Sequence, residues 1–269
     1  MRPIRILATG FAAALLFLVT LVVAAWVWSG ANTSLAFALN EVADYLPAGQ
    51  TLEVKQVHGS LREGGSIGWL RWQRGELSVQ AHEVTLGWSL MPLLDRKLRL
   101  GQITVKRLQV DDRRAPSEPT PPTDLRLPIQ IQAPFQIDAF ELSGSNALLI
   151  ENLAGNYKFD SNDHELVVEK VRISSGTYQL NARLQAQAPM TLSMQVQGAV
   201  ETAVPSSGLK VTVQATAQVQ GQLAGPEAAL DLQAQLTPEF KDSRAKAMKA
   251  SVTAHILPWQ AQVGWWGQF

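Results

Sequence analysis

The sequence predicts a mainly β protein in which an N-terminal transmembrane helix and a short amphipathic helix precede a long, curled antiparallel β-sheet. Three observations carry this prediction. An uncharged apolar run opens the chain, apolar and polar side chains alternate from residue 51 onward, and turn signals separate the alternating runs. No helical period of useful length interrupts the alternation, so antiparallel strands are favoured over parallel strands joined by helices.

Composition excludes several classes of function. The 269 residues include 23 Lys+Arg and 23 Asp+Glu, so the chain has no basic field that would attract nucleic acid. Cysteine is absent, which excludes disulfides, thiolate metal sites and cysteine nucleophiles. Because the charges balance, we expect no nucleic-acid partner.

Residues 1–30 are predicted to hold the protein in a membrane as a single-pass anchor. The stretch from Ile6 to Trp28 carries no charge, and as a helix it spans about 35 Å, enough to cross a bilayer. Arg2 and Arg5 precede it, which orients the N-terminus toward the cytoplasm. A cleaved signal peptide is the alternative, but this run is longer than the usual apolar core of one. The residues assigned to the anchor are Ile6, Leu15, Leu18, Val22, Trp26 and Trp28.

Residues 31–50 are predicted to contain a short amphipathic helix. Thr33 or Ser34 can cap it, and Pro47 and Gly49 stop it. Its apolar face carries Leu35, Leu39, Val42 and Leu46. The helix either plugs one end of the sheet or simply packs beneath the first strands, and the pattern allows both.

The sheet is predicted in two parts, residues 51–114 and 128–269. Apolar residues alternate at Leu77, Val79 and Ala81, again at Val84, Leu86, Trp88 and Leu90, and later at Ile129, Ile131, Tyr178, Leu180, Leu184, Leu192 and Val196. Turn signals include Gly64-Gly65, Gly155-Asn156, Asn162-Asp163 and Ser175-Gly176. Residues 115–127 between the two parts are rich in proline, which removes backbone donors and predicts a solvated linker.

The apolar face of this sheet has two interpretations. It is ordinary core if the sheet closes on itself or packs against a second sheet. It is a continuous apolar floor if the sheet curls into an open trough, where acyl chains gain about 0.8 kcal/mol per buried methylene. By strand parity the floor candidates are Leu77, Val79, Leu86, Trp88, Ile129, Ile131, Leu180, Leu184, Leu192 and Val196.

Motifs for catalysis and cofactor binding are absent. The four histidines are dispersed without metal-ligand spacing, and there is no Gly-x-Ser-x-Gly elbow, Walker loop or dinucleotide fingerprint. The sequence therefore predicts neither a metal site, a cofactor nor catalytic residues, and an enzyme is the least favoured class; a periplasmic hydrolase is the enzymatic alternative.

Several segments together resemble the TamB family. They are Asp44-Tyr45-Leu46-Pro47, Val57-His58-Gly59-Ser60-Leu61, the strands around 79–90, Leu108-Gln109-Val110-Asp111, Pro128-Ile129-Gln130-Ile131 and Leu142-Ser143-Gly144-Ser145. They follow the N-terminal span in the family's order, and the resemblance covers about residues 5–260. The family is recognised by the order and style of its strands, since it has no catalytic signature.

The resemblance implies a taco-shaped β-groove with an apolar interior, similar to bridge-like lipid-transfer proteins of the AsmA-like group. It implies phospholipid as the ligand, the bacterial inner membrane and periplasm as the location, and a TamA-like outer-membrane barrel as a partner. It also implies a role in the translocation and assembly module. Family members are much longer, so we expect this chain to be an N-terminal portion, truncated near Gly264–Phe269.

Two non-enzymatic functions follow. The first is phospholipid transfer between the inner and outer membranes along the groove. The second is a scaffold that assists assembly and secretion of autotransporters and other outer-membrane proteins by templating strands on a sheet edge.

Overall fold

A computed structural model describes residues 20, 23–89, 91–114, 122, 124–143, 147–203, 210–240 and 249–259. Of the predicted anchor residues, Ile6, Leu15, Leu18 and Val22 lie outside this part of the chain, whereas Trp26 and Trp28 lie in the helical residues 23–29. Within the described ranges, no helix is both long and apolar enough to span a membrane.

The short helix α2 (Ser34–Asp44) lies against β1 (Gln50–Ser60). Thr33 occupies its N-cap position but makes no side-chain cap bond. Leu35 is buried and Leu39 packs on the apolar face of the sheet, whereas Val42 is exposed. Of the two predicted arrangements, α2 therefore covers the apolar face at the β1 end.

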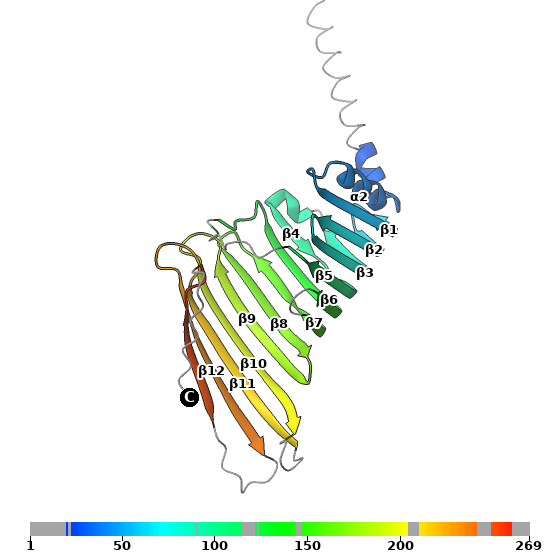
Figure 1. The fold of residues 1–269 in the computed structure, drawn as a ribbon. Coiled ribbons are helices and arrows are strands. Elements are labelled where there is room, and N and C mark those ends of the chain that lie inside the picture. Colours follow the sequence, from blue (N-terminus) through cyan, green and yellow to red (C-terminus); the bar gives the residue numbers. More distant parts are fainter. Residues whose placement is uncertain are drawn as a thin grey trace, which may run out of the picture.

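The thirteen strands of the described chain form one sheet (Figure 1). After β1, its strands are β2 (Gly64–Arg74), β3 (Leu77–Ser89), β4 (Lys97–Leu100), β5 (Ile103–Asp112), β6 (Gln130–Ser143), β7 (Leu148–Phe159), β8 (Asp163–Ile173), β9 (Gly176–Gln185), β10 (Thr191–Ala203), β11 (Lys210–Gln222), β12 (Ala229–Phe240) and β13 (Ala250–Ile256). A short 3-10 helix, η1 (Met91–Asp95), connects β3 to β4. The predicted mainly β fold with a large curled sheet is confirmed.

The sheet is antiparallel except on one side of β6. Both β4 and β5 pair with β3 in antiparallel fashion and with β6 in parallel fashion. The predicted antiparallel sheet thus holds apart from this parallel pairing, which arises because β6 begins at the end of the sheet where β5 began. β5 and β6 are hydrogen-bonded neighbours, so the sheet continues across the linker.

One transverse line of interrupted pairing crosses the N-terminal half of the sheet. On each of these strands one residue is left out of the pairing, and the unpaired residues lie opposite one another. They are Gln56, Gly68, Glu83, Lys106, Asp138 and Asn152. Gln56, Glu83 and Asn152 have φ values of 54°, 50° and 53°, in the left-handed region. Each strand thus turns locally, and its apolar residues stay on one face although their spacing changes from two to three.

The line ends at β8. There the register shifts between Val168 and Val171, so β8 has one residue more than β9 over this stretch. From β9 to β13 the pairing is uninterrupted and the alternation is regular. The bent half and the straight half together form the curled sheet of Figure 1, with α2 at one end and β13 at the other.

Candidate functional site

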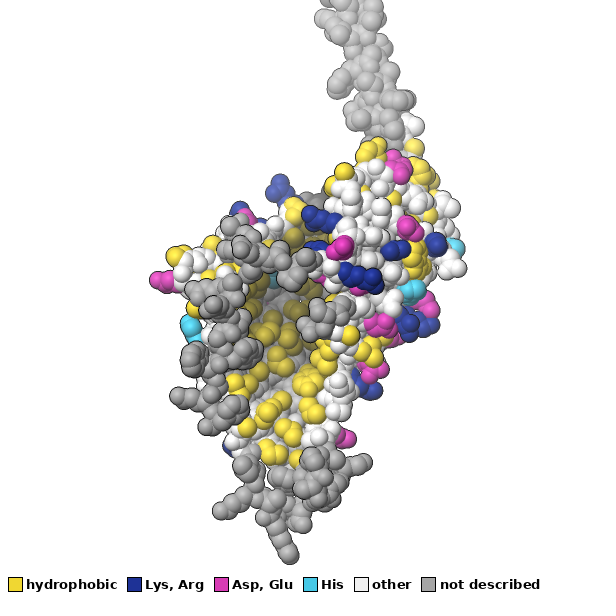
Figure 2. Space-filling view, in the orientation of Figure 1, with side chains coloured by type: hydrophobic (Ala, Val, Ile, Leu, Met, Phe, Trp, Pro, Cys, Tyr) yellow, Lys and Arg dark blue, Asp and Glu magenta, His cyan; other side chains and the backbone are white. Residues whose placement is uncertain are grey.

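The apolar face of the sheet lines a hollow, and we treat it as the candidate functional site. Figure 2 shows hydrophobic side chains gathered in this hollow over the later strands. Directly opposite partners continue the face from strand to strand. One row comprises Leu180, Val196, Ala217, Ala234 and Val252, and a second comprises Leu184, Leu192, Gly221, Leu230 and Ile256.

The strands that carry the predicted floor residues present them on this face. All but Ile129 lie within strands; Ile129 immediately precedes β6. Leu180 faces Val196 and Leu184 faces Leu192 across the β9–β10 pair. Each of the ten is half-buried, being neither sealed in a core nor fully exposed.

The predicted floor residues come only from β3, the start of β6, β9 and β10, so floor residues of the other strands were missed. A row from Val54 runs through Leu70, Ala81, Leu108 and Phe140 to Ile150. The signal was present as alternation in residues 51–57 and 103–110, but the change of spacing at the line of interrupted pairing obscured which residues share a face.

The floor is closed at one end and open at the other. Near α2, a core cluster of Ile67, Ala81, Val84 and Val105 is 4–9% exposed, and Leu39 of α2 packs against it. Farther along, Leu236 is 45% exposed and Val252 is 49% exposed. The apolar face is thus a core beneath α2 and an accessible surface over the last strands.

The opposite face of the last strands is polar and carries few charges. Its rows consist mainly of amides and hydroxyls, for example Asn181, Gln195, Gln218, Gln233 and Thr253, all exposed. These side chains satisfy their hydrogen bonds in water, so this face needs no cover. The two faces therefore differ sharply in polarity along the whole of β9–β13.

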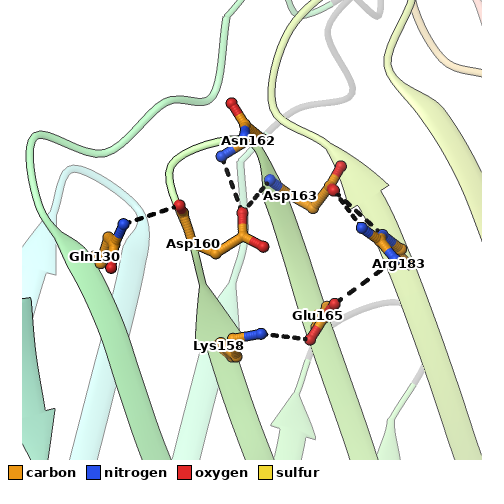
Figure 3. Close-up of polar contacts among 7 residues, drawn as sticks. All are labelled: Gln130, Lys158, Asp160, Asn162, Asp163, Glu165 and Arg183. Atoms are coloured by element: carbon orange, nitrogen blue, oxygen red, sulfur yellow. Dashed lines mark hydrogen bonds and ion pairs between the residues drawn. The ribbon is translucent and has the colours of Figure 1, made fainter.

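A charged network stands on the polar face at the β7–β8 turn (Figure 3). Lys158 Nζ lies 3.2 Å from Glu165 Oε2, and Glu165 Oε1 lies 3.8 Å from Arg183 Nη1. Arg183 Nη2 also lies 2.6 Å from Asp163 Oδ2. The pairs link β7, β8 and β9, and because Lys158 and Arg183 are exposed to solvent each pair contributes little to stability.

Asp160 shapes the β7–β8 turn within this network. Its Oδ1 accepts the backbone N–H groups of Asn162 at 3.0 Å and Asp163 at 2.9 Å. These bonds, the one from Asp163 first, lower the pKa of the Asp160 carboxyl. Because the folded-state pKa is lowered, the stabilisation is present above the ordinary carboxyl pKa and is lost as pH falls through the lowered value.

Replacing Asp160 with alanine is expected to lower the free energy of unfolding by about 1 kcal/mol, since two turn donors lose their acceptor. Asp160→Asn keeps an acceptor oxygen and is expected to cost less. The urea midpoint, followed by far-UV circular dichroism, measures both. Equal effects of the two substitutions would contradict the role of the acceptor.

On the apolar face of the same strands, both ring nitrogens of His164 make hydrogen bonds. Its Nε2 lies 3.0 Å from Leu125 O and its Nδ1 lies 2.7 Å from the Tyr157 hydroxyl. A carbonyl oxygen only accepts, so Nε2 carries a proton, and in the neutral ring Nδ1 accepts from Tyr157. The ring stacks on Phe159 with centroids 4.6 Å apart. Burial raises the pKa of the Tyr157 hydroxyl, which keeps it protonated as a donor.

At the opposite end of the sheet, the β1–β2 turn is fixed to the helical residues 23–29. Ser34 is fully buried, and its Oγ accepts the N–H of Leu61 at 3.0 Å. The N–H of Arg62 donates to Ser29 O at 3.1 Å, and the Arg62 guanidinium lies 5.4 Å from the Trp26 ring centroid. These contacts set the direction of the helix relative to the first hairpin.

Over the described ranges, no group of three or more His, Asp or Glu side chains could hold a metal ion. The site consists of an apolar floor, an exposed polar face on the other side of the sheet and a buried end beneath α2.

Comparison with known proteins gives one match. Residues 20–149, from the end of the N-terminal run to the start of β7, match the family described as TamB, N-terminal domain. No curated protein and no solved structure gave a significant match. The matched range contains α2, the line of interrupted pairing up to β6 and the closed end of the floor.

Proposed function

Residues 20–149 belong to the TamB N-terminal domain family, and from this premise we propose that the chain conducts phospholipid along its apolar groove. We propose for the chain a TamB-like role in the translocation and assembly module. In this proposal, the chain serves the module by moving phospholipid between the inner and outer membranes, and it is not an enzyme and uses no cofactor.

The observation that carries the proposal is the continuous apolar face of β9–β13, where most residues are half-buried or exposed and Val211 and Val219 are buried among them. An apolar surface of this extent is unfavourable in water and becomes favourable once acyl chains cover it, at about 0.8 kcal/mol per buried methylene. An open mouth would let the charged head group remain in water while the chains lie on the floor. That combination fits a lipid with two chains and a polar head better than a wholly apolar ligand.

The proposed location follows from the N-terminal end. The uncharged run from Ile6 to Trp28 would anchor the chain in the inner membrane, with the groove in the periplasm. Trp26 and Trp28 are 50% and 45% exposed, as expected of aromatic side chains at a membrane interface. The contacts of Ser34 and Arg62 would then hold the first hairpin at a fixed angle to the bilayer.

The test is a charge placed on the floor with a matched control on the reverse face. Val196→Asp puts a carboxylate in the middle of the apolar row and is expected to reduce co-purified phospholipid about tenfold or more, because burying an unpaired charge beneath acyl chains is costly. Gln197→Asp introduces the same charge one residue away, on the exposed polar face, and should retain lipid. Mass spectrometry of lipid extracted from each purified full-length variant gives the ratio.

Circular dichroism shows whether both variants keep the sheet. If a folded Val196→Asp variant retains as much phospholipid as Gln197→Asp does, the groove does not hold lipid and the proposal fails.

The second candidate function is a scaffold for outer-membrane protein assembly with a TamA-like barrel. It is favoured by β13, which has a neighbour on one side only among the described residues and could pair with another strand by main-chain hydrogen bonds. Under this alternative, Val196→Asp would leave crosslinking to a client protein unchanged.

A further inference from the structure

Residues 124–127 form what we call the rim latch, a short segment at the loop end of β7–β10. β5 ends at Asp112, and β6, which is parallel to it, begins at Gln130, so the chain between them must return to the opposite end of the sheet. On reaching that end, it pairs with the β9–β10 connection. Asp124 and Gln187 form an isolated antiparallel bridge, and the N–H of Leu125 donates to Ala186 O at 2.8 Å.

The rim latch lies on the apolar face of the sheet. Leu125 O is the acceptor for His164, which faces Leu184 of the floor row and stacks on Phe159. Phe159 is 1% exposed and Ala186 is 0% exposed, whereas Tyr157, Leu166 and Leu184 on the same face are half-buried. The floor residues that lie next to the rim latch, Phe159 and Ala186, are therefore among the most buried of this face.

Few interactions hold the rim latch in place. Among the described residues, it is joined to the sheet by one backbone hydrogen bond, the Asp124–Gln187 bridge and the His164 bond. With the Gln187 side-chain oxygen turned toward Arg126, that oxygen also accepts from Arg126 Nη1 at 2.9 Å and Nε at 3.1 Å. Leu125 and Leu127 are 40% and 36% exposed, so little apolar burial adds to these bonds. The ion pair between Arg126 and Asp124, at 2.6 Å, lies within the segment itself and does not join it to the sheet. Segments held by so few contacts open locally at a small free-energy cost.

We propose that the rim latch is a gate for acyl chains at this rim of the groove. When closed, it covers Phe159 and blocks passage over the loop end of β7–β10; when open, it exposes the floor there and adds two leucines to the apolar surface. Exchange of phospholipid between the groove and a membrane is then limited by opening of the latch. The inference rests on the proposed lipid-binding function.

A reversible disulfide tests the gate. Because the Leu125 N–H bonds to Ala186 O, Asp124 and Gln187 form a non-hydrogen-bonded antiparallel pair, whose Cα atoms are typically about 4.5 Å apart, within the range that a disulfide bridges. The chain contains no cysteine, so Asp124→Cys with Gln187→Cys creates only this bond, and reductant has no other target. The purified full-length double variant carries a fluorescent phospholipid, and its transfer to phosphatidylethanolamine–phosphatidylglycerol vesicles is timed.

The oxidised double variant is expected to exchange lipid at least about tenfold more slowly than the same protein after reduction, because the latch can no longer open. Each of the two single-cysteine variants, treated with the same oxidant, should exchange at the same rate before and after reduction. His164→Phe keeps the stacking on Phe159 but removes the donor to Leu125 O, and exchange should be about fivefold faster.

Each outcome of the exchange measurement either supports or overturns the gate. Equal exchange rates before and after reduction overturn the gate while leaving lipid binding in place. Lipid absent from both forms overturns the proposed function and the gate with it. A slow oxidised form supports the gate even if His164→Phe is unchanged, and then shows that the backbone pairing alone keeps the latch closed.

Discussion

Gly155→Ala is expected to destabilise the middle of the sheet by about 3 kcal/mol or more, because the added methyl group has no room. A Cβ at this position would lie 2.1 Å from Val167 O and 2.9 Å from Cζ of Phe135. The first neighbour is the backbone of β8, which cannot move without breaking its pairing with β7. The second is the ring of the residue directly opposite on β6, which lies over the glycine.

Hydrogen exchange measured by mass spectrometry locates the damage. Amides of β7 and β8 should exchange faster in the Gly155→Ala variant, whereas those of β11 and β12 should be unaffected, because strands of a long sheet contact only their neighbours.

Gly101→Ala is the matched control. Its nearest neighbour would be Gly87 O at 3.6 Å, an ordinary contact, so the same chemical change should be nearly neutral. Unchanged protection of β7 and β8 in the Gly155→Ala variant would contradict the close packing of these strands.

The sequence predicted the strand content and the polarity of the two faces, because a period of two is a local property. Leu180, Leu184, Leu192 and Val196 were assigned to one face, and the structure places them there as opposed pairs. The Ser175-Gly176 signal lies at the β8–β9 turn. In contrast, Gly155-Asn156 was interpreted as a turn but lies inside β7, where the glycine allows close approach of β8.

Features that depend on non-local pairing could not be predicted. The step from Ala81 to Val84 is visible in the sequence, yet it looks like the end of one strand and the start of another. Only the alignment of Glu83 with Gly68 and Lys106 on neighbouring strands reveals one continuous bend. The parallel pairing of β5 with β6 is equally non-local, because proline-rich composition predicts a linker without saying where it returns.

The second large effect is expected from Phe159→Ala, at about 3–5 kcal/mol of unfolding free energy. The ring is 1% exposed and stacks on His164, so its removal leaves a cavity beneath the rim latch. Phe140→Ala is the matched comparison, since Phe140 lies on the same face but is only half-buried. Part of its ring already contacts solvent, and neighbouring side chains can relax into the space, so we expect less than half of the loss at Phe159. Urea midpoints of the two full-length variants give the comparison.

This comparison bears directly on whether the floor is open. If a second layer sealed the whole apolar face, both phenylalanines would be core residues and their truncation would cost about the same. An open floor instead predicts a large loss of unfolding free energy for Phe159→Ala, next to the rim latch, and a small one for Phe140→Ala. It also predicts that added phospholipid raises the stability of the unmodified chain, since a ligand that binds only the folded state stabilises it by mass action. The increase should be smaller in Phe140→Ala, because the ring that was removed is part of the surface that acyl chains would cover.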